Sequence, residues 1–166
     1  MLEKNEIDFL NKKLCFDLQF RKDVKKNRPN NPVYYHWKAQ FVVTGKYSEE
    51  DLIRKIQEEI EAGKIHFLTK KQIRYSVQDI DELSEKVLPF FEKNIKILTE
   101  QRKKDFQLWK KAILILKENK GKPLLTWKKE DFLNLINLQK DLEKIKIKRK
   151  SSKWLSVAQE FLDNLK

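Results

Sequence analysis

The chain has 166 residues, with 37 lysines and arginines against 25 aspartates and glutamates, which gives a formal net charge of +12. This length suits one domain with a hydrophobic core, and the charge favours a polyanionic partner over lysines that serve only solubility. A single cysteine excludes an internal disulfide and a cysteine-based zinc cluster. Three glycines leave no glycine-rich phosphate loop, and two histidines are too few for a metal centre on their own.

The first part of the chain is expected to form a short helix over residues 2–10 and then a hairpin. Leu14 to Arg21 and Val33 to Thr44 both alternate apolar and polar residues, which is the period of a strand with one buried face. Residues 23–32 contain two prolines and three asparagines and are expected to form a loop. The basic residues of this loop indicate either an arm that contacts phosphates or a solvated turn.

A helix and a second hairpin are expected next. Gly45 is expected to end the preceding strand, and Ser48 is expected to cap a helix that runs to Gly63. Strands are expected over residues 64–69 and 72–78, with apolar residues again alternating with polar ones.

The second half of the chain has helical spacing. Asp79 is expected to cap a helix that Pro89 bends or ends, and Thr126 is expected to cap a later one. Residues 145–153 are expected to form a basic linker, and Ser152 is expected to open a last amphipathic helix. The pattern indicates the α+β class, with a four-stranded antiparallel sheet, helices on one face and the other face open.

Several phrases of the sequence, in this order, resemble the LAGLIDADG homing endonuclease family of the single-repeat type. They are FVVT, GKIHF, IRYSVQDIDELSEKVLPFFEKN, DFQLW and LLTWKKEDFLNLINL, and the resemblance covers Leu14 to about Leu142. It implies an αββαββα domain over residues 1–144, with residues 145–166 as a linker and helix of the same domain. Relatives of this type act as homodimers whose saddle-shaped sheets lie on the DNA major groove, and an acid at the end of the LAGLIDADG helix binds a divalent metal.

The signature motif itself is degenerate in this sequence. The segment IDFLNKKLCF aligns with AGLIDADGCF, so Asp8 stands at the packing glycine, Asn11 at the first acid, Lys13 at the metal-binding acid and Leu14 at the final glycine. A protonated lysine cannot ligate Mg²⁺, which takes oxygen ligands. We therefore expect no catalytic residue, no metal and no cofactor. The lost packing glycine also weakens the case for a homodimer.

The residues expected to bind nucleic acid lie on the open sheet face, in the connecting loops and before the DF phrase. They are Asp17, Gln19, Arg21, Lys25, Lys26, Arg28, Tyr34, His36, Lys38, Gln40, Lys70, Lys71, Arg74, Ser76 and Arg102. Arg102 is included because the resemblance implies a basic residue near the scissile phosphate at about this position.

These observations predict a nucleic-acid-binding protein that has lost nuclease activity. Structured RNA is favoured, either intron or ribosomal RNA, with the protein as a maturase-like factor or a ribonucleoprotein subunit; DNA is the other target. The alternative is an active endonuclease that uses Mg²⁺ with Asp8 or Asp17. No apolar run spans a membrane and no signal pattern begins the chain, so the protein is expected to be intracellular. Abundant lysine, asparagine and isoleucine indicate an AT-rich genome, and hence an organelle or a bacterial cytoplasm.

Overall fold

The computed structural model describes residues 1–30, 32–145 and 153–164. Helices and strands follow in the order that the sequence predicts, with short 3₁₀ turns between some of them. Their bounds are α1 Lys4–Lys13, β1 Leu14–Val24, β2 Val33–Lys46, α2 Glu50–Ile60, β3 Lys64–Leu68, β4 Gln72–Val77, α3 Ile80–Glu82, α4 Leu88–Lys93, α5 Glu100–Glu118, α6 Lys129–Ile145 and α7 Lys153–Asn164. None of the described helices is long and apolar enough to cross a membrane.

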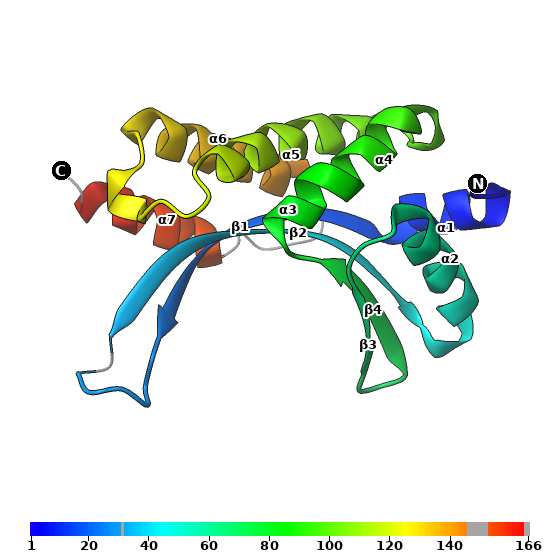
Figure 1. The fold of residues 1–166 in the computed structure, drawn as a ribbon, viewed down its shortest axis with the longest axis horizontal. Helices are drawn as coiled ribbons and strands as arrows, with labels where there is room; N and C mark the ends of the chain where they lie inside the picture. Colours follow the sequence, from blue (N-terminus) through cyan, green and yellow to red (C-terminus); the bar gives the residue numbers. More distant parts are fainter. Residues whose placement is uncertain (31, 146–152, 165–166) are drawn as a thin grey trace.

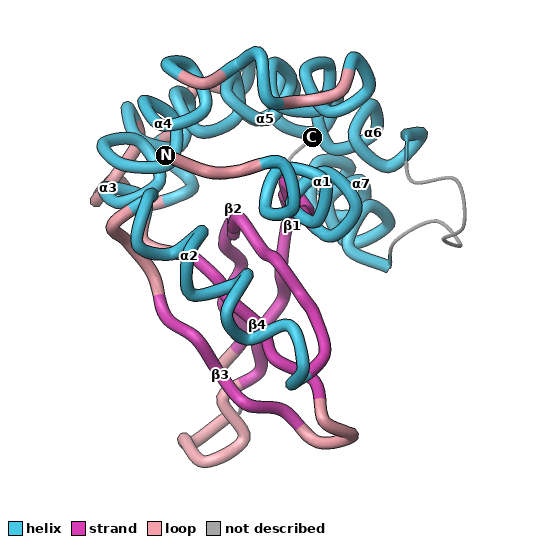
Figure 2. Tube along the Cα trace, turned by 90° about the vertical axis from the view of Figure 1, so that its right-hand side faces the viewer, coloured by secondary structure: helices cyan, strands magenta, loops and turns pink. Residues whose placement is uncertain are grey.

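The four strands form one antiparallel sheet in the order β1-β2-β4-β3. Strand β2 pairs with β1 from Val33 to Val43, but it pairs with β4 only from Phe41 to Lys46. The two hairpins therefore overlap only where the halves of β2 meet. In Figure 1 they hang from this overlap as two arms, and the layer that contains α4, α5 and α6 lies across the opposite, convex side. Figure 2 shows from the side that the layer of α4, α5 and α6 lies away from the hairpin tips, whereas α2 runs beside β3 and β4. The predicted saddle is confirmed.

The main core lies between the convex sheet face and the helical layer. The apolar residues of β1 that alternate from Leu14 to Phe20 are all buried, as the period-two pattern predicts. Phe16 lies at the centre, with its ring 5.0 Å from the ring of Trp109 and 5.3 Å from that of Phe91. Apolar residues that recur at helical spacing in α5 and α6 are also buried: Phe106, Trp109, Ile113 and Leu116 in α5, and Phe132, Leu135, Ile136, Leu138 and Leu142 in α6.

A second, smaller core supports the β1–β2 arm. Phe20 of β1 packs against Phe132 of α6 and Phe161 of α7, with ring centroids 5.2 Å apart in both pairs. Tyr35 and Trp37 of β2 border this cluster. The arm is therefore held from its convex side by two helices, which leaves the polar side chains of its other face toward the concavity.

Two glycines do not act as the sequence predicts. Gly45 does not end its strand, because β2 continues through it to Lys46. A Cβ at Gly45 would lie 3.0 Å from Cζ of Phe9, so glycine here allows α1 to approach β2 closely. Helix α2 ends at Ile60 rather than at Gly63, and Gly63 has a φ of +80° just before β3.

The predicted helix signals have mixed outcomes. Asp79 caps its helix as predicted, with Oδ1 accepting from the amides of Asp81 (2.8 Å) and Glu82 (3.1 Å). Pro89 does not end the helix, because a π turn immediately before α4 accommodates the missing donor and the helix continues to Lys93.

The predicted caps at Ser48 and Thr126 are wrong. Ser48 lies in a 3₁₀ turn before α2, where the Glu49 carboxylate accepts from the amide of Lys46 at 2.9 Å instead. The Thr126 hydroxyl donates to the Pro123 carbonyl at 2.6 Å, and α6 begins only at Lys129. Residues 146–152, which hold most of the predicted linker and the predicted start of the last helix, lie outside the described residues.

Candidate nucleic-acid interface

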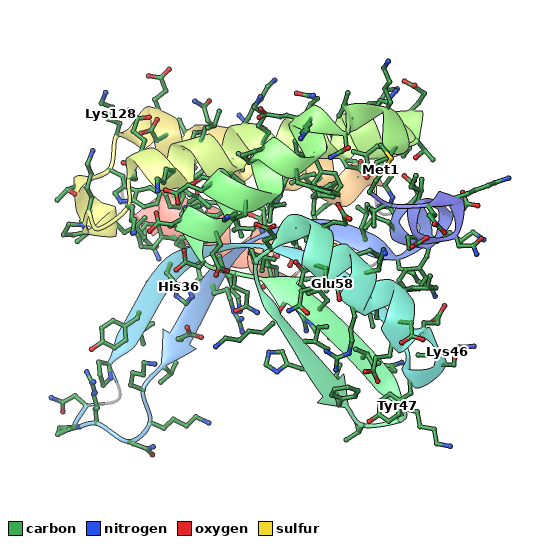
Figure 3. All side chains as sticks on the ribbon, turned by 45° about the vertical axis from the view of Figure 1, so that its right-hand side comes forward. Met1, His36, Lys46, Tyr47, Glu58 and Lys128 are labelled. Carbon is green, nitrogen blue, oxygen red and sulfur yellow. The ribbon has the colours of Figure 1, made fainter. Side chains whose placement is uncertain are left out.

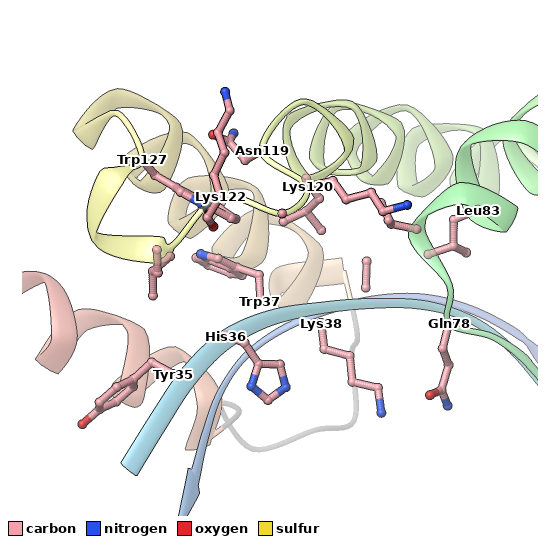
Figure 4. A pocket seen from close by; sticks show the side chains of 15 residues that line it. Tyr35, His36, Trp37, Lys38, Gln78, Leu83, Asn119, Lys120, Lys122 and Trp127 are labelled. Carbon is pink, nitrogen blue, oxygen red and sulfur yellow. Dashed lines mark hydrogen bonds between the residues drawn. The ribbon is translucent and has the colours of Figure 1, made fainter. Parts of the chain in front are cut away.

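The concave sheet face carries the polar side chains that alternate with the core residues. In the antiparallel register Asp17 pairs with Gln40, Gln19 with Lys38, and Arg21 with His36. On the other arm Arg74 lies between Thr44 and His66. The predicted residues of β1, β2 and β4 therefore share one surface. In Figure 4, His36, Lys38 and Gln78 project from one side of the sheet and Trp37 from the other.

The centre of this face is a hydrogen-bond network around a buried carboxylate. The exposed fractions of Asp17 and Gln40 are only 5% and 6%. Oδ2 of Asp17 accepts from Nε2 of Gln19 at 2.7 Å and from Nε2 of Gln40 at 2.9 Å. Oε1 of Gln40 accepts from Nη2 of Arg74 and Nε2 of Gln78, both at 3.3 Å. Asp17 and Gln40, predicted as direct contacts, thus organise their neighbours. Ser76, also predicted as a contact, is buried.

Cations surround the network. Partial burial lowers the pKa of Lys38, and Arg21 and Arg74 lower it further, because a third positive charge is disfavoured beside two others. Burial also lowers the pKa of His36, which Asp23 opposes with a carboxylate oxygen 3.4 Å from Nδ1. Mutually repelling cations on a concave face attract phosphates.

Basic residues occupy the tips of both arms. Lys25, Lys26 and Arg28 are exposed at the tip of the β1–β2 hairpin, where Nη1 of Arg28 donates to the Tyr34 hydroxyl at 3.3 Å. At the other tip Lys70 and Lys71 are exposed, with φ values of 61° and 57°. Figure 3 shows side chains projecting from both arms, with Tyr47 near the second tip; its hydroxyl donates to the Leu68 carbonyl at 2.9 Å. Lysines are thus available for phosphates at both ends of the saddle.

The predicted contact at Arg102 lies in the first turn of α5, where its Nε donates to the backbone carbonyl of Asn11 at 2.9 Å. The Asn11 side chain donates to the Ile97 carbonyl at 2.8 Å and accepts from the Thr99 amide at 3.0 Å. Asn11 therefore ties the end of α1 to the start of α5. Lys13, the last residue of α1, is exposed.

These residues do not fit a divalent metal. Lys13 brings a positive charge to the end of α1, and the Asn11 carboxamide is engaged with backbone groups. Within the part of the chain that the structure describes, no group of three histidine, cysteine, aspartate or glutamate side chains is arranged to hold a metal ion.

A sequence model of the LAGLIDADG endonuclease family matches residues 15–113. The chain belongs to this family. The matched range begins one residue after Leu14, so α1, with Asn11 and Lys13, lies outside it. No curated protein matches the chain in sequence.

Solved LAGLIDADG proteins have the same fold. I-SmaMI bound to an uncleaved DNA target with calcium ions has a TM-score of 0.70 and 20% identity over 95% of this chain and 49% of that one. The archaeal intron-encoded homing endonuclease I-Vdi141I, complexed with DNA, has a TM-score of 0.70 and 16% identity over 95% of this chain and 92% of that one. The homing endonuclease I-TnaI has a TM-score of 0.68 and 12% identity, and the match covers 99% of both chains. This chain spans about half the length of I-SmaMI and nearly all of I-TnaI.

Within this LAGLIDADG saddle, sequence reasoning omitted Gln78 from the candidate contacts. Gln78 follows β4 directly, is exposed and joins the central network through Gln40. The signal was present, because Gln78 continues the alternation of Gln72, Arg74 and Ser76. Its link to Gln40 depends on the pairing of β2 with β4, which no local pattern specifies.

Proposed function

We propose that this protein binds duplex DNA on its concave face and does not cut it by the metal-dependent route of its family. The observation that carries the proposal is the concave face itself, with its Lys38–Arg21–Arg74 cations at the centre and lysines at both tips. Two-stranded ribbons fit the wide major groove of B-DNA, whereas the major groove of A-form RNA is too narrow for them. The DNA-bound structures of I-SmaMI and I-Vdi141I support the same choice of ligand.

The loss of cleavage rests on the end of α1. The resemblance places the metal-binding acid at Lys13, and this side chain is exposed at the helix end. The exposed face of α1 also carries Lys4, Asp8 and Lys12 at helical spacing. Packing two such helices together would remove these charges from water, which is costly unless each finds a partner. We therefore propose a monomer in solution.

Fluorescence anisotropy with random-sequence duplex DNA and with structured RNA of equal length tests the ligand. The double variant Lys70→Glu/Lys71→Glu should weaken binding to duplex DNA. The matched variant Lys128→Glu/Lys129→Glu changes the net charge equally at the start of α6, on the helical layer, and should bind almost normally. Equal weakening by both variants would show non-specific attraction to a basic protein. Tighter binding to RNA than to DNA would support the maturase-like or ribonucleoprotein function instead.

A cleavage assay tests the alternative function. Bound duplexes are incubated with Mg²⁺ or with a chelator, and the products are separated by size. We expect intact DNA in both. Mg²⁺-dependent cutting that Asp8→Asn or Asp17→Asn abolishes would establish an active homing endonuclease with an unusual acid.

A further inference from the structure

The central network has a polarity that chemistry fixes. A carboxylate only accepts hydrogen bonds and a guanidinium only donates them. Gln40 lies between Asp17 and Arg74, so its Nε2 must face the carboxylate, at 2.9 Å, and its Oε1 must face the guanidinium, at 3.3 Å. The orientation of this carboxamide is therefore determined by its neighbours at both ends.

The same polarity extends to two residues at the surface. Gln19 donates through Nε2 to the Oδ2 that also accepts from Gln40, and Gln78 donates through Nε2 to Oε1 of Gln40. An amide that gives its nitrogen to the network turns its oxygen elsewhere. Gln19 is half-exposed and Gln78 exposed on the concave face, so each is placed to offer that oxygen to a ligand.

Asp17 is held firmly enough to impose this order. Its side chain is buried, and its backbone carbonyl accepts from Nε1 of the fully buried Trp109 at 3.1 Å. Strand pairing sets Asp17 directly opposite Gln40. Reversing the amide order would leave a buried carboxylate facing an amide oxygen, and an unsatisfied buried charge of this kind is strongly unfavourable.

We infer that Asp17 is a positioning residue that makes Gln19 present an acceptor to the ligand, and that Asp17 and Arg74 together do the same for Gln78 through Gln40. The two glutamines thereby select bases with an exocyclic amino group. In the major groove these bases are adenine, with N6, and cytosine, with N4, whereas guanine and thymine present O6 and O4. A glutamine whose amide can rotate freely can hydrogen-bond either to the amino groups of adenine and cytosine or to the carbonyl oxygens of guanine and thymine. This inference rests on the proposed binding of duplex DNA.

Selection of bound duplexes from a random library, followed by sequencing, tests the inference. Wild-type protein should enrich adenine or cytosine at the positions that face Gln19 and Gln78. Asp17→Ala removes the acceptor that orders Gln19, so this side chain can reverse and the enrichment at its position should fall about tenfold. Gln78 should keep its preference in this variant, because Arg74 still holds Oε1 of Gln40 in place. Enrichment at positions that face neither glutamine should be retained, which a general loss of structure would not allow.

A second variant protects the test against misfolding. Gln78→Ala removes an exposed side chain and should lose enrichment at its own position only, while Gln107→Ala, exposed on α5, should lose none. Unchanged enrichment at the Gln19 position in Asp17→Ala, or at the Gln78 position in Gln78→Ala if Asp17→Ala does not fold, would overturn the inference. Wild-type binding with no base preference would also overturn it while leaving duplex binding intact. Absence of any duplex binding would overturn both proposals.

Discussion

Replacing Trp109 with phenylalanine should destabilise the protein at the point where the helical layer holds the sheet. Trp109 has no exposed surface, and its indole N–H donates to the carbonyl of Asp17 at 3.1 Å. Phenylalanine keeps an aromatic ring against Phe16 but has no donor and a smaller volume. Two effects therefore lower the stability: the carbonyl of Asp17 loses the hydrogen bond from the buried indole, and the smaller side chain leaves a cavity.

The magnitude follows from these two losses. A buried polar group that loses its partner costs about 1–3 kcal/mol. A residual cavity of roughly 40 Å³ costs about 1 kcal/mol at ~24 cal/mol per Å³. We expect Trp109→Phe to lower the free energy of unfolding by about 2–4 kcal/mol, which a domain with ~5–15 kcal/mol of stability can survive.

Urea unfolding followed by circular dichroism measures this loss, provided that the slope with denaturant is unchanged. Trp127→Phe is the matched control, because Nε1 of Trp127 also donates to a backbone carbonyl, that of Lys122 at 3.0 Å, but in an exposed setting. The control should lose less than ~1 kcal/mol. Equal losses in the two variants would refute the assignment of Trp109 as the buried anchor of Asp17.

Three other changes test different parts of the structure. Gly63→Ala should cost about 2–4 kcal/mol of unfolding free energy, because its Cβ would lie 2.5 Å from the Ser76 carbonyl at a φ of +80°; Gly121→Ala, with φ +77° and no described atom within 4 Å, should cost only ~1 kcal/mol in the same urea assay, and equal costs would contradict the clash. DNA should bind more tightly as pH falls from about 8 to about 6, because phosphate raises the lowered pKa of His36 and binding then takes up a proton; His36→Gln should flatten this dependence in anisotropy titrations, and an unchanged profile would exclude His36. Lys25→Gln/Lys26→Gln should reduce the slope of log affinity against log salt by about 2, whereas Lys128→Gln/Lys129→Gln should leave it unchanged; equal slopes for both would remove the first tip from the interface.

The strands and their buried faces were predictable from the sequence because a period of two does not depend on which strands pair. Leu14 to Phe20 and Ile73 to Val77 alternate clearly, and each apolar member is buried. The same reasoning assigned Gln40 and Ser76 to the concave face correctly. It could not show that both are buried there, because burial on that face depends on neighbours from strands distant in sequence.

The errors arose where a local signal had a tertiary use. Gly45 resembles a strand breaker, yet it makes room for Phe9 from α1. Pro89 was expected to bend or end its helix; it does not end it, since a π turn precedes α4 and Phe91 remains in the core. The role of Asn11 as the link between α1 and α5 was hidden for a similar reason, since its partners lie 86 and 88 residues away.

The two parts of the long strand β2 pair with different strands of the saddle. Its first eight residues, 33–40, pair only with β1 among the described strands, and residues 41–46 alone join the β4 ribbon. Substitutions at the Lys25–Arg28 tip and at the Lys70–Lys71 tip share no described partner, so their effects on affinity should add. If the protein binds DNA as proposed, the base preference of each ribbon should therefore change independently of the other. A substitution near residues 40–41 should instead alter the preferences of both ribbons together.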